Sequence, residues 1–162
     1  MPAQKHIIGV ISDTHGWLDK AVIGHFHGVE HILHAGDVGD LHVPDQLKGI
    51  APVTAVSGNV DEEIDSRLLR AEETPCLFGT KIFMTHILGN PERLPPDLQG
   101  KISQINPALV VFGHTHQPYV KKIGGVLFLN PGSAGRKRFS LPRCIGILVV
   151  ENGEVEATIL EI

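Results

Sequence analysis

The sequence predicts one α/β domain over residues 1–162, in which two β-sheets pack face to face. In the first half of the chain, short β-branched runs alternate with stretches of helical spacing, an order typical of parallel strands joined by helices. In the second half, apolar runs are separated by Gly-Gly and Asn-Gly, which are signals for antiparallel hairpins. The sequence has no repeat, low-complexity tract or linker, so a single domain is expected.

Three buried strands and two helices are expected in the first half. The run HIIGVIS at residues 6–12 is apolar, largely β-branched and followed by a turn, which predicts a buried strand. Residues 17–27 carry an apolar stripe at helical spacing, and a shorter helix is expected at residues 44–48. Apolar runs at residues 31–35 and 53–57 predict the next two strands.

Hairpins and one further helix are expected in the second half. Residues 74–78 and 80–86 are apolar stretches joined at Gly79, which predicts a hairpin. The helix expected at residues 95–105 opens with two prolines, and proline is favoured in a first turn. The remaining strands are expected at residues 108–113, 119–123, 126–129, 144–150 and 154–162.

Composition excludes several classes of protein. The chain is 42% hydrophobic and 20% charged, which is typical of a globular protein with a core. Its net charge of −4 argues against a general binder of nucleic acid or of an anionic membrane. No apolar run approaches the roughly 18 residues of a membrane span. Cys76 and Cys144 fit neither a zinc knuckle nor a disulfide framework, so a cytoplasmic location is expected.

Polar side chains follow five of the expected strands, at the ends where open α/β sheets place their sites. Residues two apart in an extended chain point the same way, so Asp13 and His15 can share one target, as can His114 and His116. Two further segments, Gly-Asp and Gly-Asn, end in a carboxylate and an amide. The inventory at these strand ends is four histidines or more, two or three carboxylates and one asparagine.

This donor set indicates divalent metal ions. Imidazole and carboxylate together favour Mn, Fe, Zn or Ni, and the lack of thiolate argues against a structural zinc site. These are too many ligands for one ion and a natural number for two. Each short motif alone is most often turn chemistry, but five of them in order, each after an apolar run, argue against coincidence.

In their order along the chain, these motifs resemble those of the calcineurin-like metallophosphoesterases. The size of the chain, and an Asn-Pro-Gly-Ser segment at residues 130–133 before a terminal hairpin, are similar to the small YfcE-type phosphodiesterase branch. The resemblance implies a four-layer αββα sandwich of two mixed sheets. It also implies one metal held by Asp13, His15, Asp37 and His116 and a second held by Asp37, Asn59, His86 and His114.

The implied activity is hydrolysis of small phosphodiesters, with two divalent ions as cofactors. Mn²⁺ is the expected metal, with Fe, Zn, Ni or Mg as alternatives. The resemblance implies in-line attack on phosphorus by a hydroxide that bridges the two ions. Asp37 would bridge the ions, and Asn59 and His86 would act beside it in the catalytic centre. The partner is a small-molecule phosphodiester, and formation of a homo-oligomer is left open.

Two positions depart from the family pattern. Many members carry a histidine directly after Gly-Asn, which is thought to protonate the leaving group, whereas this chain has Val60. The departure implies a preference for good leaving groups, with Asp61 as the nearest alternative acid. Members often read Thr-His-Gly-His, whereas here Thr85-His86 is followed by Ile87, so a frequent substrate neighbour is missing.

Other residues have two interpretations each. His34 is either a partner that orients Asp37 or a satisfied buried histidine. The basic run 136–138, with Arg143, either attracts an anionic substrate or forms a solvated loop.

Two alternative functions are kept. The retromer scaffold subunit resembles the same family and binds partners without turnover, so a non-catalytic scaffold is one alternative. The other is a phosphomonoesterase. The intact set of seven ligand positions favours an enzyme over the scaffold.

Overall fold

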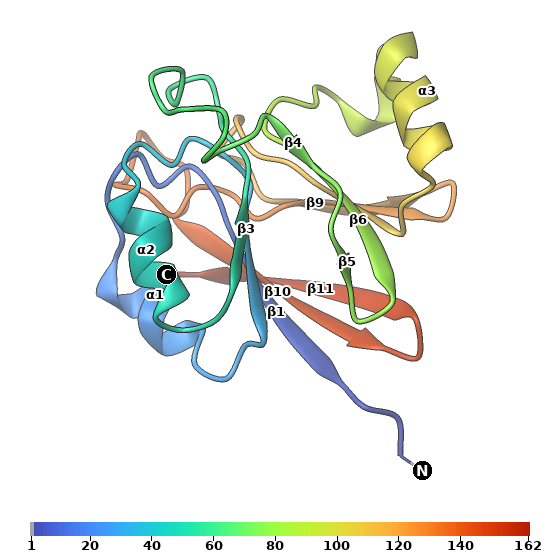
Figure 1. Ribbon diagram of the computed structural model, residues 1–162, viewed down its shortest axis with the longest axis horizontal. Coiled ribbons are helices and arrows are strands. Elements are labelled where there is room, and N and C mark those ends of the chain that lie inside the picture. Colours follow the sequence, from blue (N-terminus) through green and yellow to red (C-terminus); the bar gives the residue numbers. More distant parts are fainter. Residues whose placement is uncertain (1) are drawn as a thin grey trace.

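Two β-sheets form the centre of the molecule, and helices lie on their outer faces (Figure 1). The computed structural model describes residues 2–162. The first sheet has five strands, in the order β11 (Glu154–Glu161), β10 (Cys144–Glu151), β1 (His6–Ile11), β2 (His31–His34) and β3 (Val53–Ala55).

The second sheet has six strands. Five of them form a continuous path, and the short strand β5 pairs beside them with β6. Their order is β4 (Glu72–Glu73), β6 (Thr80–Thr85), β7 (Leu109–Val111), β9 (Val126–Asn130) and β8 (Tyr119–Ile123), with β5 at Cys76–Leu77.

Strand direction follows the expected pattern. Strands β1, β2 and β3 run parallel to one another, whereas β8 with β9 and β10 with β11 form antiparallel hairpins. The terminal hairpin pairs with β1 through an antiparallel ladder, which makes the first sheet mixed. Asn152 and Gly153 both have positive φ, as a tight turn of this kind requires.

Three apolar clusters separate the layers. Residues such as Ile8 and Leu33 of the first sheet pack against Met84 and Val111 of the second, so the main core lies between the sheets. On the outer face of the first sheet, helices α1 (Lys20–His25) and α2 (His42–Lys48) bury Val22 and Leu47, together with Phe26, which directly follows α1. Helix α3 (Pro96–Ile105) covers the second sheet through Ile102. The αββα four-layer sandwich is therefore confirmed.

The helix expected at residues 17–27 is shorter than the apolar stripe suggested. The side chain of Asp19 accepts a hydrogen bond from the Ala21 N–H at 2.9 Å and caps the helix, so α1 begins at Lys20 and Trp17 lies outside it. The hairpin expected around Gly79 is confirmed as β5 and β6. Within residues 2–162, none of the helices combines the length and apolar character that crossing a bilayer requires.

Candidate metal centre

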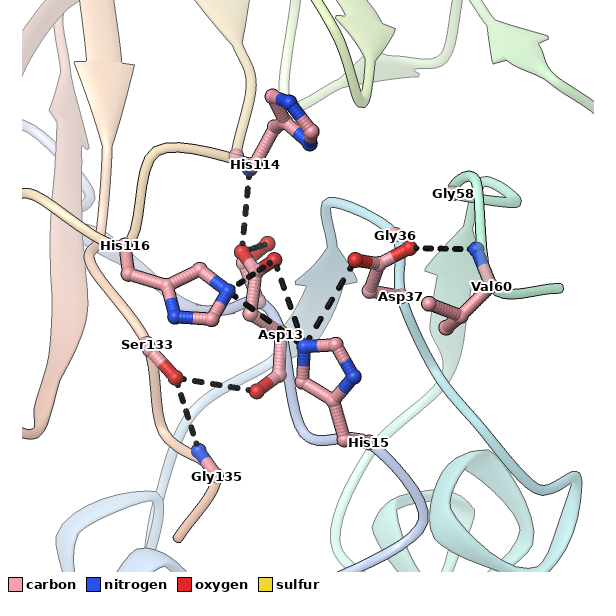
Figure 2. Close-up of polar contacts among 12 residues, drawn as sticks. Asp13, His15, Gly36, Asp37, Gly58, Val60, His114, His116, Ser133 and Gly135 are labelled. Carbon is pink, nitrogen blue, oxygen red and sulfur yellow. Dashed lines mark hydrogen bonds and ion pairs between the residues drawn. The ribbon is translucent and has the colours of Figure 1, made fainter. Parts of the chain in front are cut away.

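The carboxyl ends of strands from both sheets meet at one rim of the sandwich, and all seven predicted ligand residues lie there. Asp13 and His15 follow β1, Asp37 follows β2 and Asn59 follows β3 in the first sheet. In the second sheet, His86 follows β6, and His114 and His116 follow β7. Figure 2 shows the side chains of His15 and His116 directed at the carboxylates of Asp13 and Asp37.

A first cluster consists of Asp13, His15, Asp37 and His116, each with one ligand atom within 4.8 Å of the others. The Nε2 atom of His116 lies 3.1 Å from Oδ1 of Asp13. The Nε2 atom of His15 lies 3.7 Å from Oδ2 of Asp37 and 3.9 Å from Oδ1 of Asp13. Two carboxylates and two imidazoles therefore converge on a space that suits one cation.

A second cluster consists of Asp37, His86 and His114 under the same distance criterion. The Nε2 atom of His86 lies 3.2 Å from Oδ2 of Asp37. The amide oxygen of Asn59 lies 3.1 Å from Nδ1 of His114, so the amide belongs to this cluster as well. Asp37 is common to the two clusters, and its carboxylate stands between them.

The buried polar atoms at this rim fit a divalent cation. Nδ1 of His86 donates to the carbonyl oxygen of Ala35 at 2.7 Å, so Nε2 presents its lone pair to the site. Nε2 of His86 and Oδ1 of Asp13 are buried and have no hydrogen-bond partner among residues 2–162. Buried acceptors without a donor are unfavourable in the folded state, and coordination of a cation would satisfy both.

The neighbouring charges shift the pKa values of two of the predicted ligands, Asp37 and His86. Burial disfavours the charged form of Asp37, but the imidazole of His86 and the N–H of Val60 outweigh it, so the pKa of Asp37 is lowered. Burial also opposes protonation of His86, yet Asp37 and Asp13 outweigh it and raise its pKa. A proton and a metal ion would therefore compete for His86.

Five of the seven ligand residues have left-handed backbone conformations, which are uncommon outside glycine. The φ angles are 55° at Asp13, 48° at His15, 50° at Asp37, 74° at His114 and 61° at His116. Such conformations persist where the surrounding structure enforces them, and they concentrate at functional sites. Here they turn the chain at each strand end so that the side chain faces the shared space.

Two glycines let the backbone approach the carboxylates. A Cβ atom on Gly58 would lie 2.1 Å from Oδ1 of Asp37, and one on Gly113 would lie 2.7 Å from Oδ2 of Asp13. Both distances are far below van der Waals contact, so any side chain at either position would displace a carboxylate. The glycines of the Gly-Asn and Gly-His motifs are therefore part of the site's packing.

Comparison with known proteins identifies the family. Residues 7–153 match the calcineurin-like phosphoesterase superfamily domain. The chain belongs to this superfamily. It is 37% identical to a probable metallophosphoesterase of Methanocaldococcus jannaschii over 85% of this chain and 70% of that protein. It is 30% identical to the phosphodiesterase YfcE of Escherichia coli over 91% of this chain and 80% of that protein.

A solved structure supports the same fold. Vacuolar protein sorting 29 of Cryptosporidium parvum superposes with a TM-score of 0.75 at 21% identity, and the match covers 98% of each chain. The expected resemblance to the calcineurin-like family is thus confirmed, and with it the expectation of a metal-dependent phosphoesterase.

Within this phosphoesterase chain, Asp61 has a structural role that the sequence did not indicate. Its carboxylate is buried and accepts hydrogen bonds from the N–H groups of Val38, Gly39 and Gly58 at 3.0, 2.8 and 2.8 Å. Both oxygens are therefore occupied in joining the loop that carries Asp37 to the loop that carries Asn59. These hydrogen bonds argue against Asp61 as an acid for the leaving group, and that assignment stays a prediction to be tested. Its spacing of three residues from Gly58, typical of a turn, is the signal that could have indicated this role.

His34 is a satisfied buried histidine rather than a direct partner of Asp37. The Gly36 N–H donates to Nδ1 at 3.2 Å, so Nε2 carries the proton and donates to Oγ1 of Thr14 at 2.9 Å. Thr14 in turn donates to the carbonyl of Val38 at 3.0 Å. Complete burial lowers the pKa of His34 to about 4, which keeps the ring neutral beneath the site.

A cleft of about 320 Å³ opens onto the two clusters. Its walls include residues that the sequence did not single out, among them Phe139 and Leu141. Arg138 lines the cleft too, which favours substrate attraction over a purely solvated loop for this part of the basic run. The pKa of His15 is lowered mainly by burial, and the positive charge of Arg138 contributes to the shift. A neutral His15 suits a metal ligand.

Proposed function

We propose that this chain is a phosphodiesterase that uses two divalent metal ions to hydrolyse small phosphodiesters. The observation that carries the proposal is the place of Asp37 in both ligand clusters. Oδ2 of Asp37 lies 3.7 Å from Nε2 of His15 and 3.2 Å from Nε2 of His86, whereas Oδ1 accepts a hydrogen bond from the Val60 N–H. Asp37 thus faces both clusters and is suited to be a ligand of two neighbouring ions. Asp13, His15 and His116 would complete one ion's ligands, and Asn59, His86 and His114 those of the other.

Two bound divalent ions would activate water and offset the charge that develops on a phosphoryl group. The residues of the chain then determine which substrate fits. Two carboxylates and one neutral amide leave the loaded site with an excess of positive charge, which suits an anionic phosphodiester. Arg138, at the wall of the cleft, adds a further positive charge.

The side chain of Val60 lines the cleft next to Asn59. It has no acidic group that could protonate the oxygen of the leaving group. Because the Asp61 carboxylate is occupied by three backbone N–H groups, it does not replace the missing acid. We therefore expect good leaving groups, whose oxygen departs as an anion without protonation, to react fastest. We propose Mn²⁺ as the metal, because nitrogen and oxygen donors without thiolate suit it; Fe, Zn, Ni and Mg are the alternatives to test.

Hydrolysis of bis-p-nitrophenyl phosphate with and without Mn²⁺ tests the proposal. We expect turnover that depends on the metal, is abolished by EDTA and accompanies two ions per chain by elemental analysis. A comparison with p-nitrophenyl phosphate separates this activity from the alternative, a phosphomonoesterase.

The non-catalytic scaffold is the second alternative, and the structural likeness to vacuolar protein sorting 29 fits it. Absence of turnover with every divalent metal tested, in protein shown to be folded, would establish that alternative. The complete set of seven donors around one rim supports the enzyme instead. The cytoplasmic location stays a prediction. Formation of a homo-oligomer stays open.

A further inference from the structure

The loop that forms one wall of the cleft is closed at its base and turns sharply at its tip. Ser133 and Arg143 form an isolated β-bridge, and the Cys144 N–H donates to the carbonyl of Ser133 at 2.9 Å. At the tip, the Leu141 N–H donates to the carbonyl of Arg138 at 3.3 Å, which defines a tight turn over residues 138–141. Arg138 and Leu141, the two ends of this turn, both line the cleft.

Trp17 connects this loop to the segment that follows β1 and carries Asp13 and His15. The guanidinium carbons of Arg136 and Arg143 each lie 4.8 Å from the centre of the Trp17 ring. Arg143 also donates to the carboxylate of Asp19 at 2.8 Å and to the carbonyl of Gly135 at 2.7 Å. These two arginines therefore attach the loop to the segment of Trp17 and Asp19, which closely follows Asp13 and His15 in the sequence.

Arg138 differs from both of these arginines because it lines the cleft beside His15 and His116. Residues 136–143 contain four basic side chains and no acidic one, in a chain with a net charge of −4. Positive charge is thus concentrated at the mouth of the metal site, where an anionic ligand would enter.

Phe139 follows Arg138, and its conformation is unfavourable for its residue type. Its side chain is 95% exposed, and its φ of 54° occupies a turn position at which glycine is favoured. Neither burial nor backbone preference explains a phenylalanine at this place. The ring stands at the cleft with Val60, which is 49% exposed, and with Leu141. Together these side chains provide an apolar wall opposite the polar metal ligands.

We propose that the turn 138–141 selects the substrate: Arg138 binds the phosphate oxygens, and Phe139 stacks on a planar ring carried by an ester group. The substrates would be phosphodiesters of nucleoside type. This inference rests on the proposed function and names its substrate class. Phe139 is almost fully exposed within the described part of the chain and stands next to a cation and a metal-ligand cluster. This arrangement matches a ligand that has a planar base at one end and a phosphate at the other.

Binding of product analogues to the Mn²⁺-loaded protein tests the proposal without catalysis. Calorimetry compares AMP with ribose 5-phosphate, which has the same phosphate and sugar but no base. We expect AMP to bind about tenfold more tightly, the effect of one base stacked on an aromatic ring. Phe139→Gly should remove this preference and leave the affinity for ribose 5-phosphate unchanged. Arg138→Gln should weaken both ligands by a similar factor.

The chain offers matched controls for both substitutions. Phe78 also has a positive φ, 51°, but stacks on His6 and does not line the cleft, so Phe78→Gly should leave the preference intact. Lys137→Gln removes the same charge from the same loop at a position that does not line the cleft. Circular dichroism and thermal melting establish that each variant is folded. Phe139→Asn, which tolerates a left-handed backbone, replaces Phe139→Gly if that variant does not fold.

The outcomes separate this inference from the proposed function. Equal affinity for AMP and ribose 5-phosphate, an unchanged preference in Phe139→Gly, or no larger effect of Arg138→Gln than of Lys137→Gln would overturn the inference while hydrolysis of bis-p-nitrophenyl phosphate still stands. If Phe139 confers the preference for AMP but no diester is hydrolysed with any metal, the proposed function fails and the selective turn is retained.

Discussion

The two ligand clusters share Asp37 but differ in charge and in exposure. The first cluster has a second carboxylate, that of Asp13, which is completely buried. The second cluster has no further carboxylate, and both His114 and the neighbouring Asn59 are exposed. Both clusters border the cleft, and the extra carboxylate together with the burial of Asp13 favours tighter binding of an ion in the first cluster. One rim of the sandwich thus carries two candidate ligand clusters that share Asp37 and differ in charge.

Asp37→Ala should have the largest effect, because it removes a ligand from both clusters at once. We expect kcat/KM for bis-p-nitrophenyl phosphate to fall by at least about 10³-fold and the metal content to fall below one ion per chain. Asp13→Ala is the matched control, because it removes a carboxylate from the first cluster only. Equal metal loss in the two variants would contradict the shared role of Asp37.

Asp61→Ala should loosen the link between the loops of the two clusters. The substitution leaves three backbone N–H groups without their charged acceptor, which we expect to lower the free energy of unfolding by about 3 kcal/mol. Urea denaturation of the metal-free protein measures the change. The pH profile of Asp61→Asn decides between structure and catalysis: a structural role leaves its basic limb in place, and loss of that limb would restore Asp61 as the acid.

His34 should make the protein less stable in acid. Its pKa is lowered in the folded state from 6.5 to about 4, so the unfolded chain binds the proton more readily and stability declines as the pH falls through this interval. At pH 5 the loss should be about 2 kcal/mol relative to pH 7.5. In His34→Gln, the amide side chain still has a hydrogen-bond acceptor and a donor, but it does not take up a proton in this pH range. Urea unfolding at both pH values should show a smaller difference for the variant, and an equal difference would exclude His34 as the source.

Metal titration should resolve the inequality of the two clusters directly. Addition of Mn²⁺ to metal-free protein should give two binding events whose affinities differ by about tenfold or more, because the first cluster has one more negative charge. His114→Ala should remove the weaker event, and His116→Ala should weaken the stronger one. If His114→Ala removed the tighter Mn²⁺ binding event instead, the first cluster would not be the stronger site.

Most of the fold could be predicted from the sequence, because its signals are local. The β-branched runs before Asp13 and Asp37 and the Asn-Gly turn at residues 152–153 each act within a few residues. The limits of α1 could not be predicted from its apolar stripe. The Asp19 cap makes the helix begin after Trp17, and the Trp17 ring contacts two arginines that lie more than a hundred residues away.

The sequence by itself determined the donor types at the site, their order along the chain and their positions after strands. These properties are local, because a strand end followed by a turn places its own side chain at the rim. Only the tertiary structure decided that Asp37 stands between two clusters, that Asp61 joins two loops and that the turn of Arg138 and Phe139 forms a wall of the cleft. Each of these depends on distances between segments that are far apart in the sequence. The loops that Asp61 joins follow neighbouring strands of the first sheet, whereas the two clusters and the cleft combine residues of both sheets, and such distances are set by how the strands and sheets pack.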